Sequence, residues 1–285
     1  MNMVAGFILG LVAMTFFGMY GITRKFVKTV FLEYLLDMGI GTLFTSSFIG
    51  YCFMEELQFS VSNTLVYFLS GLLWYTGTLC WTKSIDYIGY SSSVSIKNTN
   101  GLISALYGII LFKEYSWERP FPLFLVLLGG LLVVGSAIIF GRLTADEEGK
   151  IISAGNLKKG VYLALGAAFG HASYTVPGRI LLGQVDWGMD FYLFTSLGIF
   201  LASLIGYLGI YPRVRMRQFL KTSIKEHLLG ILSGTLFAIA FFCLISSMNL
   251  VGMSIGMLLV NMNIVVALPF SIALLKEISY RHYKK

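Results

Sequence analysis

Apolar runs of about 20 residues recur along the whole chain, and no other feature constrains its fold as strongly. A helix needs roughly 20 apolar residues to cross the ~30 Å hydrocarbon core of a bilayer. Hydrophobic residues make up 56 % of the sequence and charged residues only 12 %, and a soluble core cannot bury that much apolar surface. The sequence therefore predicts an all-α polytopic membrane protein with nine spans, at residues 3–23, 31–53, 64–82, 88–112, 121–140, 160–180, 190–211, 228–246 and 251–275.

An internal repeat divides the chain. Residues 68–116 align without gaps over residues 231–279, an offset of 163, and 15 of the 49 positions are identical. Chance matching of apolar residues is a poor explanation for identical polar residues inside spans, and these include Asn98 with Asn261 and Asn100 with Asn263. The first span aligns with the sixth at an offset of 154, which matches Tyr20 with Tyr174.

The repeat unit should hold five spans, and an odd number inverts the second copy in the membrane. We expect a first five-helix repeat over residues 1–141, a cytoplasmic linker over 142–159, and a second repeat over 160–285 that has only four spans. The predicted fold is thus an inverted repeat of two five-helix units, a ten-helix transporter fold without its last helix. Either the sequence is truncated or the protein has nine spans. In inverted-repeat transporters the solute binds near the membrane midplane, between the halves.

The distribution of lysine and arginine predicts the orientation. With the N-terminus outside, 17 basic residues fall in inner loops and at the inner C-terminal end, and 3 fall outside. This is the positive-inside bias of membrane proteins, so we predict a multi-pass protein of the plasma membrane with its N-terminus outside and its C-terminal end inside. The same placement accounts for the net charge of +7 without nucleic acid as a partner.

Charged side chains inside spans are costly and commonly mark function. Lys97 lies deep in the fourth span, and Asp37 and Glu33 share one face of the second span. We predict that Lys97 pairs with Asp37, either within a functional site or as a static pair that fixes helix packing. Glu33 and Asp37 are the first candidates for coupling to protons, and His171, near the middle of span six, is a third.

The repeated asparagines predict a solute site. An amide both donates and accepts hydrogen bonds, which suits a hydroxyl-rich ligand. Residues two apart do not share a helix face, so either one asparagine of each pair faces a cavity or the helix is distorted there. Hydrogen bonding between helices is the alternative role. The predicted substrate-binding residues are Lys97, Asn98, Asn100, Asn261 and Asn263, together with the aromatic Trp74, Tyr20 and Tyr174, whose rings can stack on the apolar face of a sugar.

Motifs for enzymatic chemistry are missing from the sequence. It has no GxSxG, HExxH or P-loop motif, and its three histidines are far apart in sequence. The three cysteines include no CxxC pattern. We therefore expect no enzyme activity, no cofactor and no metal site, and we expect a small solute, protons and the lipid bilayer as partners, with a homodimer left open.

Short motifs in the second half of each repeat resemble the glucose/ribose uptake group of the drug/metabolite transporter superfamily. They are Gly71-Leu72-Leu73-Trp74 through Gly77, Lys83-Ser84-Ile85, Gly89 to Ser91, Glu114-Tyr115-Ser116, Lys158-Lys159-Gly160 and Val251-Gly252. The resemblance implies ten helices in inverted five-helix halves and monosaccharide uptake, with protons as the coupling ion. The chain departs from the group at Ser95, Lys97 and Gly101, where proline, a small polar residue and glutamine are usual. A buried lysine also suits an acidic sugar or another anion.

Two rival functions remain open at this stage. The same fold can export or exchange amino acids or other metabolites, because a fold does not select its solute. The chain can also be a membrane sensor or assembly partner that transports nothing. The leading hypothesis is secondary active uptake of a monosaccharide, or a similar small polar solute, by alternating access.

Overall fold

The described part of the chain is helical, and no strand occurs in it. The computed structural model describes residues 2–53, 60–113, 154–183, 187–209 and 212–270, together with 124, 127–129, 131–132, 135 and 273–274. Most of the predicted fifth span (121–140), much of the linker (142–159) and the C-terminal end from residue 275 lie outside the described residues. The predicted all-α class is confirmed for the part that is described.

The elements of the first half follow the predicted spans closely. They are α1 (Asn2–Met19), the short 3₁₀ helix η1 (Ile22–Phe26), α2 (Phe31–Phe53), α3 (Val61–Ile88), α4 (Tyr90–Lys97), α5 (Asn100–Leu106) and the π-helical turn η2 (Tyr107–Leu111). In the second half they are α7 (Ala154–Ser173), α8 (Val176–Leu182), α9 (Met189–Leu208), α10 (Pro212–Phe219), α11 (Ile224–Val251), α12 (Met253–Asn261) and α13 (Ile264–Phe270).

Four helical stretches among the described residues are both long and apolar enough to cross a membrane. They are Met3–Phe26, Met189–Leu208, Ile224–Val251 and Met253–Phe270. Helices α2, α3 and α7 have comparable lengths of 23, 28 and 20 residues. Their spanning remains a prediction, as does the count of nine, because polar side chains such as Lys83 and Asp86 in α3 lower the apolar character of these helices.

The helix bounds repeat with the same offsets as the sequence. Helices α3 and α11 both contain 28 residues, and both of their ends differ by 163 in number. Each is followed by a glycine with positive φ, Gly89 (φ 77°) and Gly252 (φ 86°), and then by a short helix. Helix α1 with η1 corresponds to α7 with α8 at the offset of 154. Apart from α10, the described elements therefore follow the same order in the two halves.

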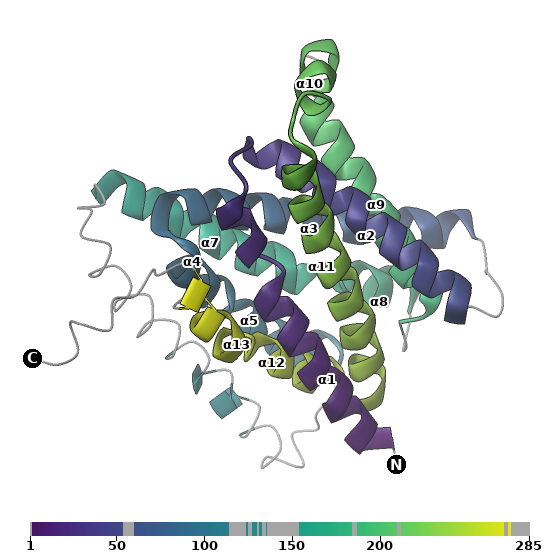
Figure 1. Cartoon of the computed structure of the whole chain (residues 1–285). Helices are drawn as coiled ribbons and strands as arrows, with labels where there is room; N and C mark the ends of the chain where they lie inside the picture. The colour runs from purple at the N-terminus through teal and green to yellow at the C-terminus, as the bar shows by residue number, and fades with distance from the viewer. Residues whose placement is uncertain are drawn as a thin grey trace, which may run out of the picture.

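The helices pack so that elements of the two halves alternate (Figure 1). Helix α1 lies along α11, α7 lies along α3, and α2 contacts both α9 and α11. Glycine permits the close approach: a Cβ on Gly41 would collide with the carbonyl of Ile231, and one on Gly170 would meet the backbone of Gly77. Small residues at such crossings let the backbones come together, which is how helices in membranes gain packing energy.

Helix α10 was not predicted. It lies in the basic segment after α9 and carries Arg213, Arg215 and Arg217. The hydroxyl of Tyr207, near the end of α9, donates to the carbonyl of Arg215 at 2.7 Å and fixes α10 to α9. Figure 1 shows α10 beyond the end of α9, away from the short helices α4, α5, α12 and α13.

Candidate functional site

Two broken helices meet in the interior of the bundle. Helix α4 ends at Lys97 and α5 begins at Asn100, while α12 ends at Asn261 and α13 begins at Ile264. At both breaks the backbone amides bond to the carbonyl three residues earlier, as in a 3₁₀ helix, instead of four. One such bond runs from the Gly101 amide to the Asn98 carbonyl (3.1 Å). Asparagine disfavours a helix interior because its side chain competes for the backbone groups. The helix distortion that the asparagine spacing allowed is therefore present in both halves.

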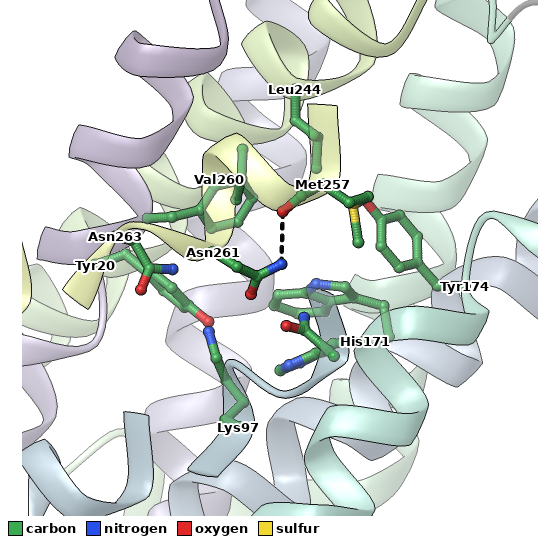
Figure 2. A pocket seen from close by; sticks show the side chains of 12 residues that line it. Tyr20, Lys97, His171, Tyr174, Leu244, Met257, Val260, Asn261 and Asn263 are labelled. Carbon is green, nitrogen blue, oxygen red and sulfur yellow. Dashed lines mark hydrogen bonds between the residues drawn. The ribbon is translucent and has the colours of Figure 1, made fainter. Parts of the chain in front are cut away.

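Asparagine side chains join the two breaks. The amide nitrogen of Asn98 donates to the backbone carbonyl of Asn261 (3.0 Å) and to the side-chain oxygen of Asn263 (2.8 Å). The Asn261 amide donates to the Met257 carbonyl at 2.6 Å, which is the dashed line in Figure 2. Asn98 thus has the bonding role between helices that was the alternative to solute binding.

A pocket opens beside the breaks, with about 360 Å³ of empty space that includes part of the open solvent. Figure 2 shows side chains from both halves pointing into it. The lining residues are Phe17, Tyr20, Trp74, Lys97, Asn100, His171, Tyr174, Leu244, Met257, Val260, Asn261 and Asn263.

Both copies of the repeat contribute to the pocket in matched positions. At the offset of 154 the lining includes Phe17 with His171 and Tyr20 with Tyr174, and at 163 it includes Lys97 with Val260 and Asn100 with Asn263. The pocket therefore lies where the two halves meet. Two of the four pairs are unequal, because one copy carries Lys97 or His171 where the other carries an apolar side chain.

Most of the predicted substrate-binding residues line this pocket. They are Lys97, Asn100, Asn261, Asn263, Trp74, Tyr20 and Tyr174. Asn98 is not among the lining residues. Of the three predicted coupling residues, His171 lines the pocket, whereas Glu33 and Asp37 do not.

The predicted pair between Lys97 and Asp37 is wrong. The carboxylate of Asp37 contacts His227, whose Nδ1 lies 2.9 Å from both carboxylate oxygens. The Lys97 ammonium instead lies over the ring of Trp81, 5.2 Å from its centroid. The pair was predicted from the depth of each residue in its span, but depth does not give the rotation of a helix about its own axis. Helix α2 turns Asp37 toward α11, whereas α4 turns Lys97 into the pocket.

The acidic residues of α2 belong to a separate polar cluster. His227 holds Asp37 through Nδ1, and its Nε2 lies 3.0 Å from the Phe219 carbonyl. Glu33 accepts a hydrogen bond from the Thr222 hydroxyl, in the turn between α10 and α11. This cluster fastens α2 to the start of α11, and His227 was not foreseen as a member of it.

His171 is held at the wall of the pocket. Its Nε2 lies 2.9 Å from the hydroxyl of Thr78 on α3, and its ring centroid lies 5.5 Å from that of Trp74. The approach is close, because a Cβ on Gly77 would touch the His171 ring. The imidazole is therefore fixed in orientation, with an ionisable side chain at the edge of the cavity.

The pocket has polar capacity left for a ligand. The side-chain oxygen of Asn100 is buried and accepts no hydrogen bond within the described structure. A buried acceptor without a donor is costly, and a ligand hydroxyl would satisfy it. The Trp74 and Tyr174 rings add broad apolar surface on the same cavity. A ring with several hydroxyl groups matches this combination.

Four apolar lining residues were missed: Phe17, Leu244, Met257 and Val260. The repeat contained the signal for two of them. Phe17 is the repeat counterpart of His171, and Val260 that of Lys97, both of which were predicted site residues. Applying the offsets to every predicted site residue would have found them.

Comparison with known proteins places the chain in a family. The family model described as "Sugar transport protein" matches residues 8–283. The glucose uptake protein GlcU of Bacillus subtilis (strain 168) is 29 % identical over 243 residues, which cover 85 % of this chain and 78 % of that protein.

Two further relatives are named "Probable glucose uptake protein GlcU". The one from Priestia megaterium is 28 % identical and aligns over 73 % of this chain and 68 % of its own length. The one from Bacillus anthracis is 29 % identical over 84 % of this chain and 79 % of its own length. Across the relatives from Bacillus and Priestia the matched region covers 65–79 % of the relative. The chain belongs to the sugar transport protein family, whose members are membrane transporters rather than enzymes.

Proposed function

We propose that the chain is a secondary active transporter that takes up a hydroxyl-rich small solute of the sugar class by alternating access. The observation that carries the proposal is the pocket at the two helix breaks, lined by matched residues from both copies of the repeat. Discontinuous helices at corresponding points of two halves are the structural mark of a transporter site. Rocking one half against the other would expose such a pocket to each side in turn.

The chemistry of the lining supports a monosaccharide. Trp74 and Tyr174 offer apolar ring faces, and Asn100, Asn261 and Asn263 offer amide groups for hydroxyls. The relatives point the same way, because their names describe glucose uptake. An exporter or exchanger of other metabolites has no observation here that favours it over uptake of a sugar.

The arrangement in the membrane is part of the proposal. Helices α3 and α11 have the same length, and a glycine with positive φ follows each of them. Both features support two related units over residues 1–141 and 160–285. Five spans in the first unit would invert the second. The basic inner loops support an N-terminus outside and a C-terminal end inside the plasma membrane.

Proton coupling would act through a titratable side chain at the pocket. Of the predicted coupling residues, His171 is the one that lines the pocket, so protonation there would be sensed directly by a bound solute. Glu33 and Asp37 could act only at a distance, through the cluster with Thr222 and His227.

Uptake into proteoliposomes tests the proposed function. Purified protein is reconstituted, and accumulation of labelled D-glucose, D-ribose and their sugar acids is followed with and without an inwardly directed proton gradient. The proposal expects saturable accumulation of at least one of these solutes above that in protein-free liposomes, and its loss when the gradient is collapsed. Equal signals from protein-containing and protein-free liposomes for every solute would refute it.

A further inference from the structure

The pocket contains a buried cation that the described part of the protein leaves without a carboxylate. Lys97 is 4 % exposed and ends α4 at the wall of the pocket. No carboxylate oxygen of the described residues lies within 4.0 Å of its ammonium, and none of the lining residues is acidic. The Trp81 ring, 5.2 Å away, gives a cation–π contact but no opposite charge.

The acidic residues of α2 and α3 have other partners. Asp37 holds His227, Glu33 accepts from Thr222, and Asp86 pairs with Arg24 at 3.2 Å. The other ionisable residues that line the pocket are His171, Tyr20 and Tyr174, and none of these is a carboxylate. A lysine in such a place is expensive to bury unless an anion joins it.

The repeat shows that the fold does not need a charge at this place. Val260 is the counterpart of Lys97 in the second half, and it lines the same pocket. An apolar side chain therefore fits the end of the short helix before the break. Asn98 and Asn100 recur as Asn261 and Asn263, so the lysine departs from a repeat that is otherwise kept at the break.

We infer that the solute carries one negative charge in addition to its hydroxyl groups, as a hexuronate or an aldonate does, and that Lys97 binds its carboxylate. Figure 2 shows the Lys97 side chain rising from α4 into the pocket toward Tyr20, with Asn261 and Asn263 on the facing helix break. The ammonium has three donors for the carboxylate, and the unsatisfied Asn100 oxygen accepts from a hydroxyl.

A single carboxylate matches the site better than a phosphate. One lysine neutralises one unit of charge, whereas a phosphate monoester carries about −1.5 to −2 near neutral pH. The excess would remain buried among apolar residues such as Phe17, Leu244 and Met257. This inference rests on the proposed function, since it names the solute class for the same pocket.

Matched pairs of ligands test the inference. Calorimetry on the detergent-purified full chain compares D-glucose with D-glucuronate and D-gluconate, and D-ribose with D-ribonate. In at least one set the acid should bind about tenfold more tightly than the neutral sugar, the discrimination expected of one good charge-assisted contact. Lys97→Met should remove that preference by weakening binding of the acid about tenfold, while Lys97→Arg should retain the preference.

Lys83→Met is the matched control, because Lys83 also lies over an aromatic ring, 4.6 Å from the Phe31 centroid, but does not line the pocket. Lys97→Gln replaces Lys97→Met if the latter aggregates, and the wild-type preference is measured without any variant. Binding of a neutral sugar as tight as that of its acid overturns the inference and leaves the proposed function standing. If monodisperse protein binds neither member of any set, the proposed function falls with it.

Discussion

Asp37 and Lys97 are both buried charges inside helices, but their surroundings differ. Asp37 has His227 as a partner, and His227 is held in turn by the Phe219 carbonyl, so the carboxyl group is hydrogen-bonded within the protein. The Lys97 side chain lies over the Trp81 ring and lines the pocket. At the scale of residues, the first is a structural cluster between α2 and α11, and the second is a group that a ligand can reach.

Removing the Asp37 side chain should cost stability and spare binding. Asp37→Ala leaves Nδ1 of a largely buried imidazole without its acceptor, and an unsatisfied buried polar group costs about 1–3 kcal/mol. Thermal unfolding in detergent should shift down, while the Kd for the transported solute stays within about threefold.

Glu226→Ala is the control for this change. Glu226 lies in the first turn of α11, next to His227, and among the described residues its half-buried carboxylate accepts from the Lys28 amide at 3.3 Å. Its free energy of unfolding should lie within about 0.5 kcal/mol of that of the wild type. An Asp37→Ala protein with normal stability but much weaker solute binding would contradict the separation of the two sites.

At the scale of elements, the short helices α4 and α12 aim the site residues. Each begins after a glycine whose backbone is nearly closed to other residues: Gly89 has φ 77° and ψ 169°, and Gly252 has φ 86° and ψ 159°. This region is essentially restricted to glycine. The turn lets the chain leave a 28-residue helix and re-enter the bundle with the asparagines at the break facing inward.

Alanine at either turn should destabilise the protein. Gly89→Ala and Gly252→Ala each force a Cβ into the strained region, at a cost of about 1–3 kcal/mol. Gly166→Ala in α7 is the matched control, since its Cβ would meet Cys80 at ordinary distances, 3.7 Å from Sγ and 4.0 Å from Cβ. Thermal unfolding should separate the two turn variants from the control, and three equal midpoints would show that the turns are not constrained as described.

The sequence predicted more of the elements than of their contacts. Polar residues repeated inside apolar runs located the two breaks, because asparagine is unusual there unless it is bonded or functional. Hydropathy could not show that span four is divided after Lys97, since a window of span length averages the polar residues 90–97 with the apolar residues that follow. It also missed α10, because a short basic helix lacks the apolar run that was sought.

The sequence could not show which side chains contact each other across neighbouring helices. Lys97 and Asp37 were matched by depth, but a rotation about either helix axis moves a side chain to another neighbour. His227 lies in a basic segment and had no sequence neighbour that indicated Asp37. The roles of Asn98 and Asn100, two residues apart, also separated only in three dimensions, one bonding between helices and the other lining the cavity.

At the scale of the whole molecule, two structurally similar halves place a pocket between them. Helix α1 packs on α11 and α7 on α3, so each half holds an element of the other. In the proposed function the interface, rather than either half alone, is where a solute would contact both halves. Alternating access would open the pocket to each side in turn, and the orientation of the chain determines which end of the bundle faces outside.

Cysteine labelling in intact cells should reveal that orientation. In a variant without Cys52, Cys80 and Cys243, we expect a membrane-impermeant maleimide to label Met3→Cys at the outer N-terminus and not Leu220→Cys, which follows α10. Both positions are exposed, at 66 % and 76 %. Permeabilised cells should label both, and the reverse pattern in intact cells would place the N-terminus inside.

The central claim is that the pocket at the helix breaks binds the transported solute, and the KM for uptake by an Asn100 variant tests it most directly. Asn100→Leu removes the unsatisfied acceptor and adds an apolar surface that cannot bond a hydroxyl. Asn63→Leu, near the start of α3 and outside the pocket, is the control. The account predicts that KM in proteoliposomes rises about tenfold or more for Asn100→Leu and is unchanged for Asn63→Leu. An unchanged KM in a well-folded Asn100→Leu protein would contradict it.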